Sequence, residues 1–166
     1  LDCEVKDNLL WVEDGTRPAE TLLPLIERKI GPALRRHEAR FTPRLVHGDC
    51  TPKNALLTPG GRLVLVDWDE AVAGFWVWDY AGLTYWYSYM RRDGGPPGPA
   101  GLDEARASFF SAYGETGFGG EELREVEWAL HVAMAAGEMS YLYKIGDAHG
   151  HARSRSLLLG LLGMTV

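Results

Sequence analysis

Residues 47–70 read HGDCTPKNALLTPGGRLVLVDWDE, and this stretch carries most of what the sequence says about the fold. Two short apolar runs, at 55–58 and 62–66, flank a Pro-Gly-Gly sequence at 59–61. Apolar runs joined by such a turn predict a β-hairpin. A further short strand is expected at 44–47, just before the polar segment. The polar segments on either side of the hairpin are therefore expected to meet at one edge of it.

Three side chains that carry oxygen atoms stand at these strand ends, namely Asp49, Asn54 and Asp67. Oxygen ligands of this type suit Mg²⁺, which is commonly shared with the phosphates of a substrate. An Asp followed five residues later by Asn, and after a hairpin by a second Asp, is the catalytic layout of protein-kinase-like phosphotransferases. Taken singly, such residues in loops are most often turn formers and backbone caps. Their joint spacing carries the functional interpretation.

The segment 47–54 resembles the catalytic loop of the aminoglycoside phosphotransferase and choline kinase group, in which His-Gly-Asp replaces the His-Arg-Asp of protein kinases. LVDWDE at 65–70 resembles the metal-binding segment of that group, and GFWVWDYA at 74–81 is similar to a third segment with a Gly followed by Asp-Leu-Ala. The resemblance is close over 44–86 and extends to the later helices in outline. One departure is the Cys-Thr-Pro-Lys at 50–53, where the group often has Leu-His-Pro-Gly.

The resemblance implies a role for each matched residue. Asp49 would orient the attacking hydroxyl of a substrate and accept its proton. Asn54 and Asp67 would hold Mg²⁺ against the phosphates of ATP, because phosphoryl transfer depends on in-line positioning and on charge neutralisation. His47 would pack the catalytic loop, and Asp79 would accept hydrogen bonds from the backbone of that loop.

Neighbouring charged residues have weaker assignments. Lys53 is predicted to lie near the transferred phosphate as a nucleotide contact, and its alternative is a solvated loop lysine. Asp69 and Glu70 stand beside the predicted metal ligand, so they are predicted to contact a cation or the amines of a substrate. Cys50 is interpreted as a packing residue, because a nucleophilic cysteine needs a base and an electropositive site.

Candidates outside this region are fewer. Glu138 is predicted as a contact for a substrate amine, because the group binds its acceptors with acidic residues from late helices. His131, seven residues earlier, is on the same helix face and is read with Glu138 as a surface or partly buried pairing. His149 and His151 are expected to flank a glycine in a loop, where a metal pair is a remote alternative.

The rest of the chain reads as mostly helical. A helix that starts near Thr16 is expected to kink at Pro24 and to break at 31–32 before a segment at 33–40. The aromatic run after the hairpin is interpreted as core rather than as a ring-stacking pocket. Further helices are expected at 75–90, 102–113, 121–145 and 152–162.

Composition excludes several classes of protein. The net charge of −6 argues against a general nucleic-acid binder and leans slightly toward a cationic small-molecule acceptor. Cys3 and Cys50 are too few for a disulfide framework, so a reducing cytoplasmic compartment is expected. The longest apolar stretch, at 157–166, is far shorter than the ~18 residues that cross a membrane, so no membrane partner is expected.

The length of the chain limits the kinase interpretation to part of such an enzyme. A chain of 166 residues is about one domain, whereas a kinase of this kind also needs a β-sheet lobe with a glycine-rich loop and a strand lysine. No glycine-rich turn flanked by predicted strands precedes His47, and Lys6 lies on a segment too short to be that strand. Residues 1–166 are therefore read as a single mainly helical α+β domain: the C-terminal lobe of a protein-kinase-like fold, with a small embedded β-hairpin and no nucleotide-binding lobe.

The primary interpretation is thus one lobe of an ATP- and Mg²⁺-dependent small-molecule kinase, with the missing lobe supplied in cis or as a separate piece. The isolated chain is expected to be inactive. The alternative is a non-catalytic binding or scaffolding module, against which the joint presence of Asp49, Asn54 and Asp67 counts. A metal-dependent hydrolase built on His47, Asp49, Asp67 and Asp69 is a third reading, disfavoured because Asn54 has no obvious place in it.

Overall fold

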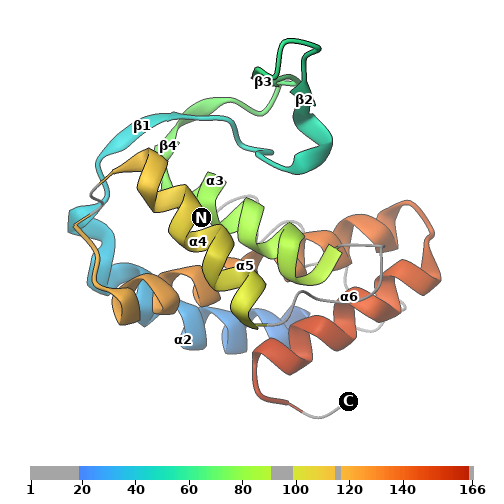
Figure 1. Ribbon diagram of the computed structural model, residues 1–166. Helices are drawn as coiled ribbons and strands as arrows, with labels where there is room; N and C mark the ends of the chain where they lie inside the picture. Colours follow the sequence, from blue (N-terminus) through green and yellow to red (C-terminus); the bar gives the residue numbers. More distant parts are fainter. Residues whose placement is uncertain (1–18, 91–98, 115–116, 165–166) are drawn as a thin grey trace. The chain divides into compact units, whose positions relative to one another are not determined.

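The structure is a computed structural model that describes residues 19–90, 99–114 and 117–164 (Figure 1). Over these ranges the protein is a mostly helical α+β chain with small antiparallel sheets, as the sequence predicts. The Cα positions form two compact units. The sheet unit is Ala39–Leu123, and the helical unit combines Leu1–Glu38 with Arg124–Val166.

Both small sheets belong to the sheet unit. Strands β2 (Ala55–Leu57) and β3 (Leu63–Leu65) form the predicted hairpin, with Leu56 opposite Val64. Strand β1 (Pro43–Val46) pairs antiparallel with β4 (Val72–Phe75). The hairpin is followed by β4 rather than directly by a helix, so one strand was missed by the sequence analysis.

A glycine in β4 explains part of that omission. Gly74 lies opposite Arg44, and a Cβ atom at position 74 would stand 2.9 Å from Cγ2 of Val46. Glycine weakens the sequence signal for a strand, yet here it allows the close approach of a neighbouring side chain. The sequence VAGF therefore pairs as a strand without showing the usual strand composition.

Aromatic side chains form the core beside these sheets. Helix α3 (Val77–Tyr85) continues as a π-helical turn, η3 (Trp86–Met90), and α4 (Pro99–Tyr113) lies against α3. The rings of Trp76 and Tyr80 are buried and pack on Phe109 and Phe110 with centroid separations of 5.1–6.3 Å. The interpretation of the aromatic run as core is confirmed for these residues.

Three helices dominate the helical unit: α2 (Ala19–His37), α5 (Gly120–Lys144) and α6 (Ala148–Leu161). The predicted break at 31–32 is wrong, because α2 is one helix from Ala19 to His37 that includes Pro24 and Pro32; the kink at Pro24 stays a prediction. Each proline removes one backbone donor. The burial of Ile26, Ile30 and Ala33 along one face supplies the packing that keeps the helix continuous.

The start of α6 corrects a second expectation. The carboxylate of Asp147 accepts a hydrogen bond of 2.8 Å from the backbone N–H of Gly150, which caps the helix. His149 and His151 therefore lie in the first turn of α6, not in a loop. In the described ranges, no helix combines the length and the apolarity that a membrane crossing requires.

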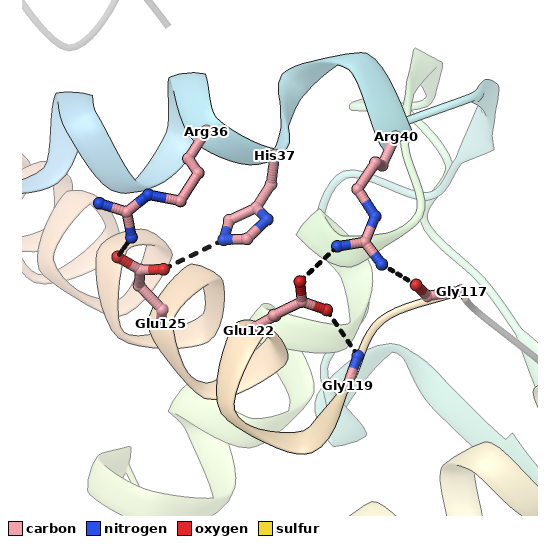
Figure 2. Close-up of polar contacts among 7 residues, drawn as sticks. All are labelled: Arg36, His37, Arg40, Gly117, Gly119, Glu122 and Glu125. Carbon is pink, nitrogen blue, oxygen red and sulfur yellow. Dashed lines mark hydrogen bonds and ion pairs between the residues drawn. The ribbon is translucent and has the colours of Figure 1, made fainter.

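The end of α2 carries an acid-sensitive contact. Glu125 accepts hydrogen bonds from Arg36 and from Nε2 of His37, the latter at 3.0 Å (Figure 2). These bonds, led by that from His37, hold the pKa of the Glu125 carboxyl below its ordinary value of 4.5. A lowered folded pKa stabilises the protein above the unfolded pKa, and this contribution is lost as the pH falls through the folded value.

We expect Glu125→Gln to lower the free energy of unfolding at pH 7 by no more than about 1 kcal/mol, because the pair is partly exposed. The same variant should lose less stability than the parent between pH 5 and pH 3, since the titrating carboxyl is gone. Urea denaturation at both pH values measures this difference. Equal pH dependence in the two proteins would contradict it.

The loop before α5 is held within the sheet unit by a second arginine. Arg40, at the end of the short helix η1 (Glu38–Arg40), donates to the carboxylate of Glu122 at 2.7 Å and to the carbonyl of Gly117 (Figure 2). Its guanidinium lies 4.5 Å from the centre of the Phe118 ring. Glu122 in turn accepts from the N–H of Gly119, so the turn that leads into α5 is fixed from both sides.

Candidate active site

The segment His47-Gly48 is anchored by one carboxylate. Asp79, in the first turn of α3, accepts the backbone N–H of His47 at 2.7 Å and that of Gly48 at 3.0 Å, one on each oxygen. Gly48 has φ +87°, and a Cβ atom there would lie 2.4 Å from the carbonyl oxygen of Glu70. Glycine is therefore required at this position, and both loops that border the site pass close to each other here.

His47 joins the loop to the end of β3. Its ring is almost fully buried, and Nε2 lies 2.9 Å from the carbonyl oxygen of Val66. A carbonyl only accepts, so Nε2 carries the hydrogen of this bond. The ring packs on Trp68 with centroids 4.5 Å apart, which fixes the backbone on both sides of Asp67.

Asn54 holds Asp49 at two points. Its Nδ2 donates to the main-chain oxygen of Asp49 and to Oδ2 of the same residue, each at 2.9 Å. The backbone between them is a tight turn, in which Thr51 N–H donates to the Asp49 carbonyl and Asn54 N–H donates to the Thr51 carbonyl. Nζ of Lys53 lies 3.0 Å from Oδ2 of Asp49. Asn54 is buried, whereas the Asp49 carboxylate is one-third exposed and can meet a ligand.

Asp67 lies two residues after the end of β3, and the hairpin brings its neighbour Val66 to Asn54. The N–H of Val66 donates to the carbonyl of Asn54 at 2.9 Å, which joins the two strand ends. Asp67 has φ +64° and, among the residues that the structure describes, is the only one other than glycine with a positive φ. Such backbone strain is concentrated at functional sites. Asp69 and Glu70 are exposed on the same segment.

A model of the phosphotransferase enzyme family (APH) matches residues 5–126. The chain belongs to this family. The match includes the anchored loop, the hairpin and α3, so the contacts around Asp49 lie within the matched region, and the family suggests phosphotransferase activity in general. No curated protein and no solved structure matches the chain significantly.

The donor set of this phosphotransferase fits a magnesium ion. Nδ2 of Asn54 is engaged by Asp49, which leaves Oδ1 of the amide as an oxygen donor, and Asp67 comes one residue after Val66, the backbone partner of Asn54. Mg²⁺ is usually held by one or two such oxygens, with water and substrate phosphates completing its shell. The described residues contain no group of three or more His, Cys, Asp and Glu suited to a metal ion.

Two residues predicted from the later helices lie in the helical unit. Glu138 is paired with Arg153 at 3.5 Å. His131 is buried and lies 3.9 Å from the buried carboxylate of Glu127, so it is a core residue rather than a surface one. The acceptor role of Glu138 stays a prediction.

Several residues that build the site were missed by the sequence analysis. Trp78 donates from Nε1 to the carbonyl of Gly48 at 3.0 Å, and Trp68 donates from Nε1 to the carbonyl of Leu65. Both tryptophans therefore satisfy backbone oxygens of the loops that carry Asp49 and Asp67. Their proximity to the polar motifs in the sequence was the available signal, because an indole N–H near a loop finds backbone acceptors there.

Cys50 is adjacent to Asp49, and its thiol is expected to react slowly as a nucleophile. Burial, followed by the negative charges of Asp79 and Asp49, raises the pKa of the thiol to about 11. An ordinary cysteine with a pKa of 9.0 carries about 100-fold more thiolate at neutral pH. We expect the rate of alkylation of Cys50 by iodoacetamide at pH 7.5 to be at least about 100-fold below that of a free thiol.

Peptide mapping by mass spectrometry separates Cys50 from Cys3 in this experiment. The alkylation rate of Cys50 should keep rising tenfold per pH unit between pH 8 and pH 10, because the thiolate fraction is still far from saturation. A rate that levels off near pH 9 would contradict the raised pKa.

Proposed function

We propose that this phosphotransferase transfers the γ-phosphate of ATP, together with Mg²⁺, to a hydroxyl group of a small molecule. The observation that carries the proposal is the double contact from Asn54 to Asp49, because it holds a partly exposed carboxylate in one orientation. Positioning of this kind is the main requirement of phosphoryl transfer, which has little covalent chemistry for the protein to perform.

The proposed reaction is the direct transfer of the γ-phosphate to the acceptor hydroxyl. The oxygen of the acceptor hydroxyl forms a bond to the γ-phosphorus, the bond from that phosphorus to the β–γ bridging oxygen breaks, and ADP leaves. The hydroxyl proton passes to the Asp49 carboxylate and from there to water. Asn54 and Asp67 would hold the Mg²⁺, which supplies charge neutralisation at the phosphoryl oxygens when bound. Lys53 is a candidate contact for the nucleotide.

The nucleotide would be covered by a separate β-sheet lobe, in cis or as a second piece. Support comes from the hairpin, whose two faces both present apolar side chains to solvent. Leu57 and Leu63 are opposite each other in the register and are 73% and 67% exposed, while Leu56 and Val64 are exposed on the other face. Exposed apolar area on this scale favours a further layer of protein or ligand.

The acceptor is proposed to be a small hydroxyl compound of the aminoglycoside, choline or homoserine type, with Asp69 and Glu70 available for its amines. The cationic preference is supported by the net charge of −6 and by the exposure of these two carboxylates. A cytoplasmic location, where ATP is available, belongs to the same proposal.

The test is a phosphoryl-transfer assay on the product of the complete reading frame and on the 166-residue chain, with Mg·ATP and a panel of hydroxyl acceptors. The complete product should transfer phosphate to at least one acceptor, and the 166-residue chain should show no turnover. Robust turnover by the shorter chain would overturn the requirement for a second lobe. Absence of transfer to any acceptor, with Mg·ATP hydrolysis also absent, would favour the alternative of a non-catalytic binding or scaffolding module.

A further inference from the structure

We propose that Lys53 is a positioning residue, which acts on the reaction by fixing the Asp49 carboxylate. The inference rests on the proposed function, and it goes beyond it because Lys53 there is at most a contact for the nucleotide. The structure places the lysine on the carboxylate that receives the acceptor hydroxyl, at 3.0 Å from Nζ to Oδ2.

Two donors share one carboxylate oxygen. Oδ2 of Asp49 receives Nδ2 of Asn54 at 2.9 Å and Nζ of Lys53 at 3.0 Å. Among the residues that the structure describes, none donates to Oδ1. An acceptor hydroxyl that approaches Asp49 therefore finds Oδ1 as the oxygen with free lone pairs. The lysine and the amide together select which oxygen takes the proton and in which direction it points.

The backbone between the two residues makes this contact local. Pro52 opens the short helix η2 (Pro52–Asn54), and its ring restricts the turn that places position 53 beside position 49. The hydrogen bonds from Thr51 N–H to Asp49 and from Asn54 N–H to Thr51 close the same turn. Glycine is common at position 53 in the pattern that the loop resembles, and glycine provides no cation there.

The contact matters little for the stability of the fold. The side chain of Lys53 is 64% exposed and that of Asp49 is 34% exposed. Exposed ion pairs contribute about 0–1 kcal/mol, whereas a displacement of about 1 Å in a reacting group can cost about 100-fold in rate. An effect of Lys53 on turnover without a comparable effect on unfolding is therefore the signature of positioning.

The experiment uses Lys53→Met in the product of the complete reading frame, with Mg·ATP and water as the acceptor, so that no other acceptor needs to be known. We expect kcat to fall about tenfold. KM for Mg·ATP should stay within twofold of the parent value, and the urea midpoint should equal that of the parent within error. Lys53→Arg should recover most of kcat, because a guanidinium also pairs with a carboxylate. Lys29→Met, at an exposed position on α2, is the matched control and should leave kcat unchanged.

Each outcome separates the two proposals. A rise in KM for Mg·ATP with kcat unchanged would assign Lys53 to the nucleotide and overturn the positioning role, as would a kcat equal to that of the parent. If the parent neither transfers phosphate to any acceptor nor hydrolyses Mg·ATP, or if Asp49→Asn equals the parent, the proposed function fails and the positioning role fails with it. A second measurement needs no turnover: in ¹³C NMR of the 166-residue chain, the chemical shift of Lys53 Cε should change in Asp49→Asn, because the ammonium group loses its charged partner. An unchanged Lys53 shift in that variant would overturn the contact.

Discussion

Replacement of Asp49 by asparagine is expected to lower kcat for phosphoryl transfer about 1000-fold in the active enzyme. The asparagine keeps the size of the side chain and can still meet Asn54, but it offers no basic oxygen to the acceptor hydroxyl. Because Asp49 is proposed to meet the acceptor rather than the nucleotide, KM for Mg·ATP should change little. Steady-state kinetics on the parent and the variant measure both constants.

Asp103→Asn is the matched control for this change of charge. The Asp103 side chain is 72% exposed on α4 and pairs only locally, with Arg106 at 3.0 Å, so kcat should stay within twofold of the parent. A loss of less than tenfold in Asp49→Asn would mean that the carboxylate is not the group that receives the proton. The same small loss would also weaken the comparison with the catalytic loop of protein-kinase-like enzymes.

Local sequence patterns predicted the parts of the site that depend on neighbours in the chain. The hairpin was predictable because its turn and its two apolar runs lie within 55–66. The contact between Asn54 and Val66, which precedes Asp67, then follows, since a hairpin brings its ends together. The family assignment, now shown over residues 5–126, rested on three local motifs at 47–54, 65–70 and 74–81.

Contacts between distant segments were beyond the sequence patterns. The pairing of β1 with β4 joins residues about 30 positions apart, and the glycine in β4 hides its strand character. The continuity of α2 depends on burial of its apolar face, which a rule about proline does not include. Likewise, the ion pair between Lys53 and Asp49 depends on the closed turn around Thr51. The presence of a lysine at position 53 does not by itself predict this contact.

The anchoring carboxylate of the loop gives the second large prediction. Asp79→Asn is expected to lower the free energy of unfolding of the sheet unit by about 3 kcal/mol, because hydrogen bonds to a charged acceptor contribute about 1.5–3 kcal/mol each. The asparagine retains one acceptor oxygen and turns an amide N–H₂ toward a backbone N–H. One of the two donors, on His47 or Gly48, is then left without an acceptor.

Hydrogen exchange of the His47 and Gly48 amides reports on this loss directly. Both amides should exchange about 100-fold faster in Asp79→Asn than in the parent, since 1.4 kcal/mol corresponds to a factor of ten. Asp103→Asn again serves as the control, because loss of its exposed ion pair should cost no more than about 1 kcal/mol and leave the two amides protected. If the two variants lost equal stability, the hydrogen bonds to Asp79 would contribute no more to stability than an exposed ion pair, and the prediction would be wrong. Turnover should fall in Asp79→Asn alone, because the loop that loses its anchor is the one that carries Asp49.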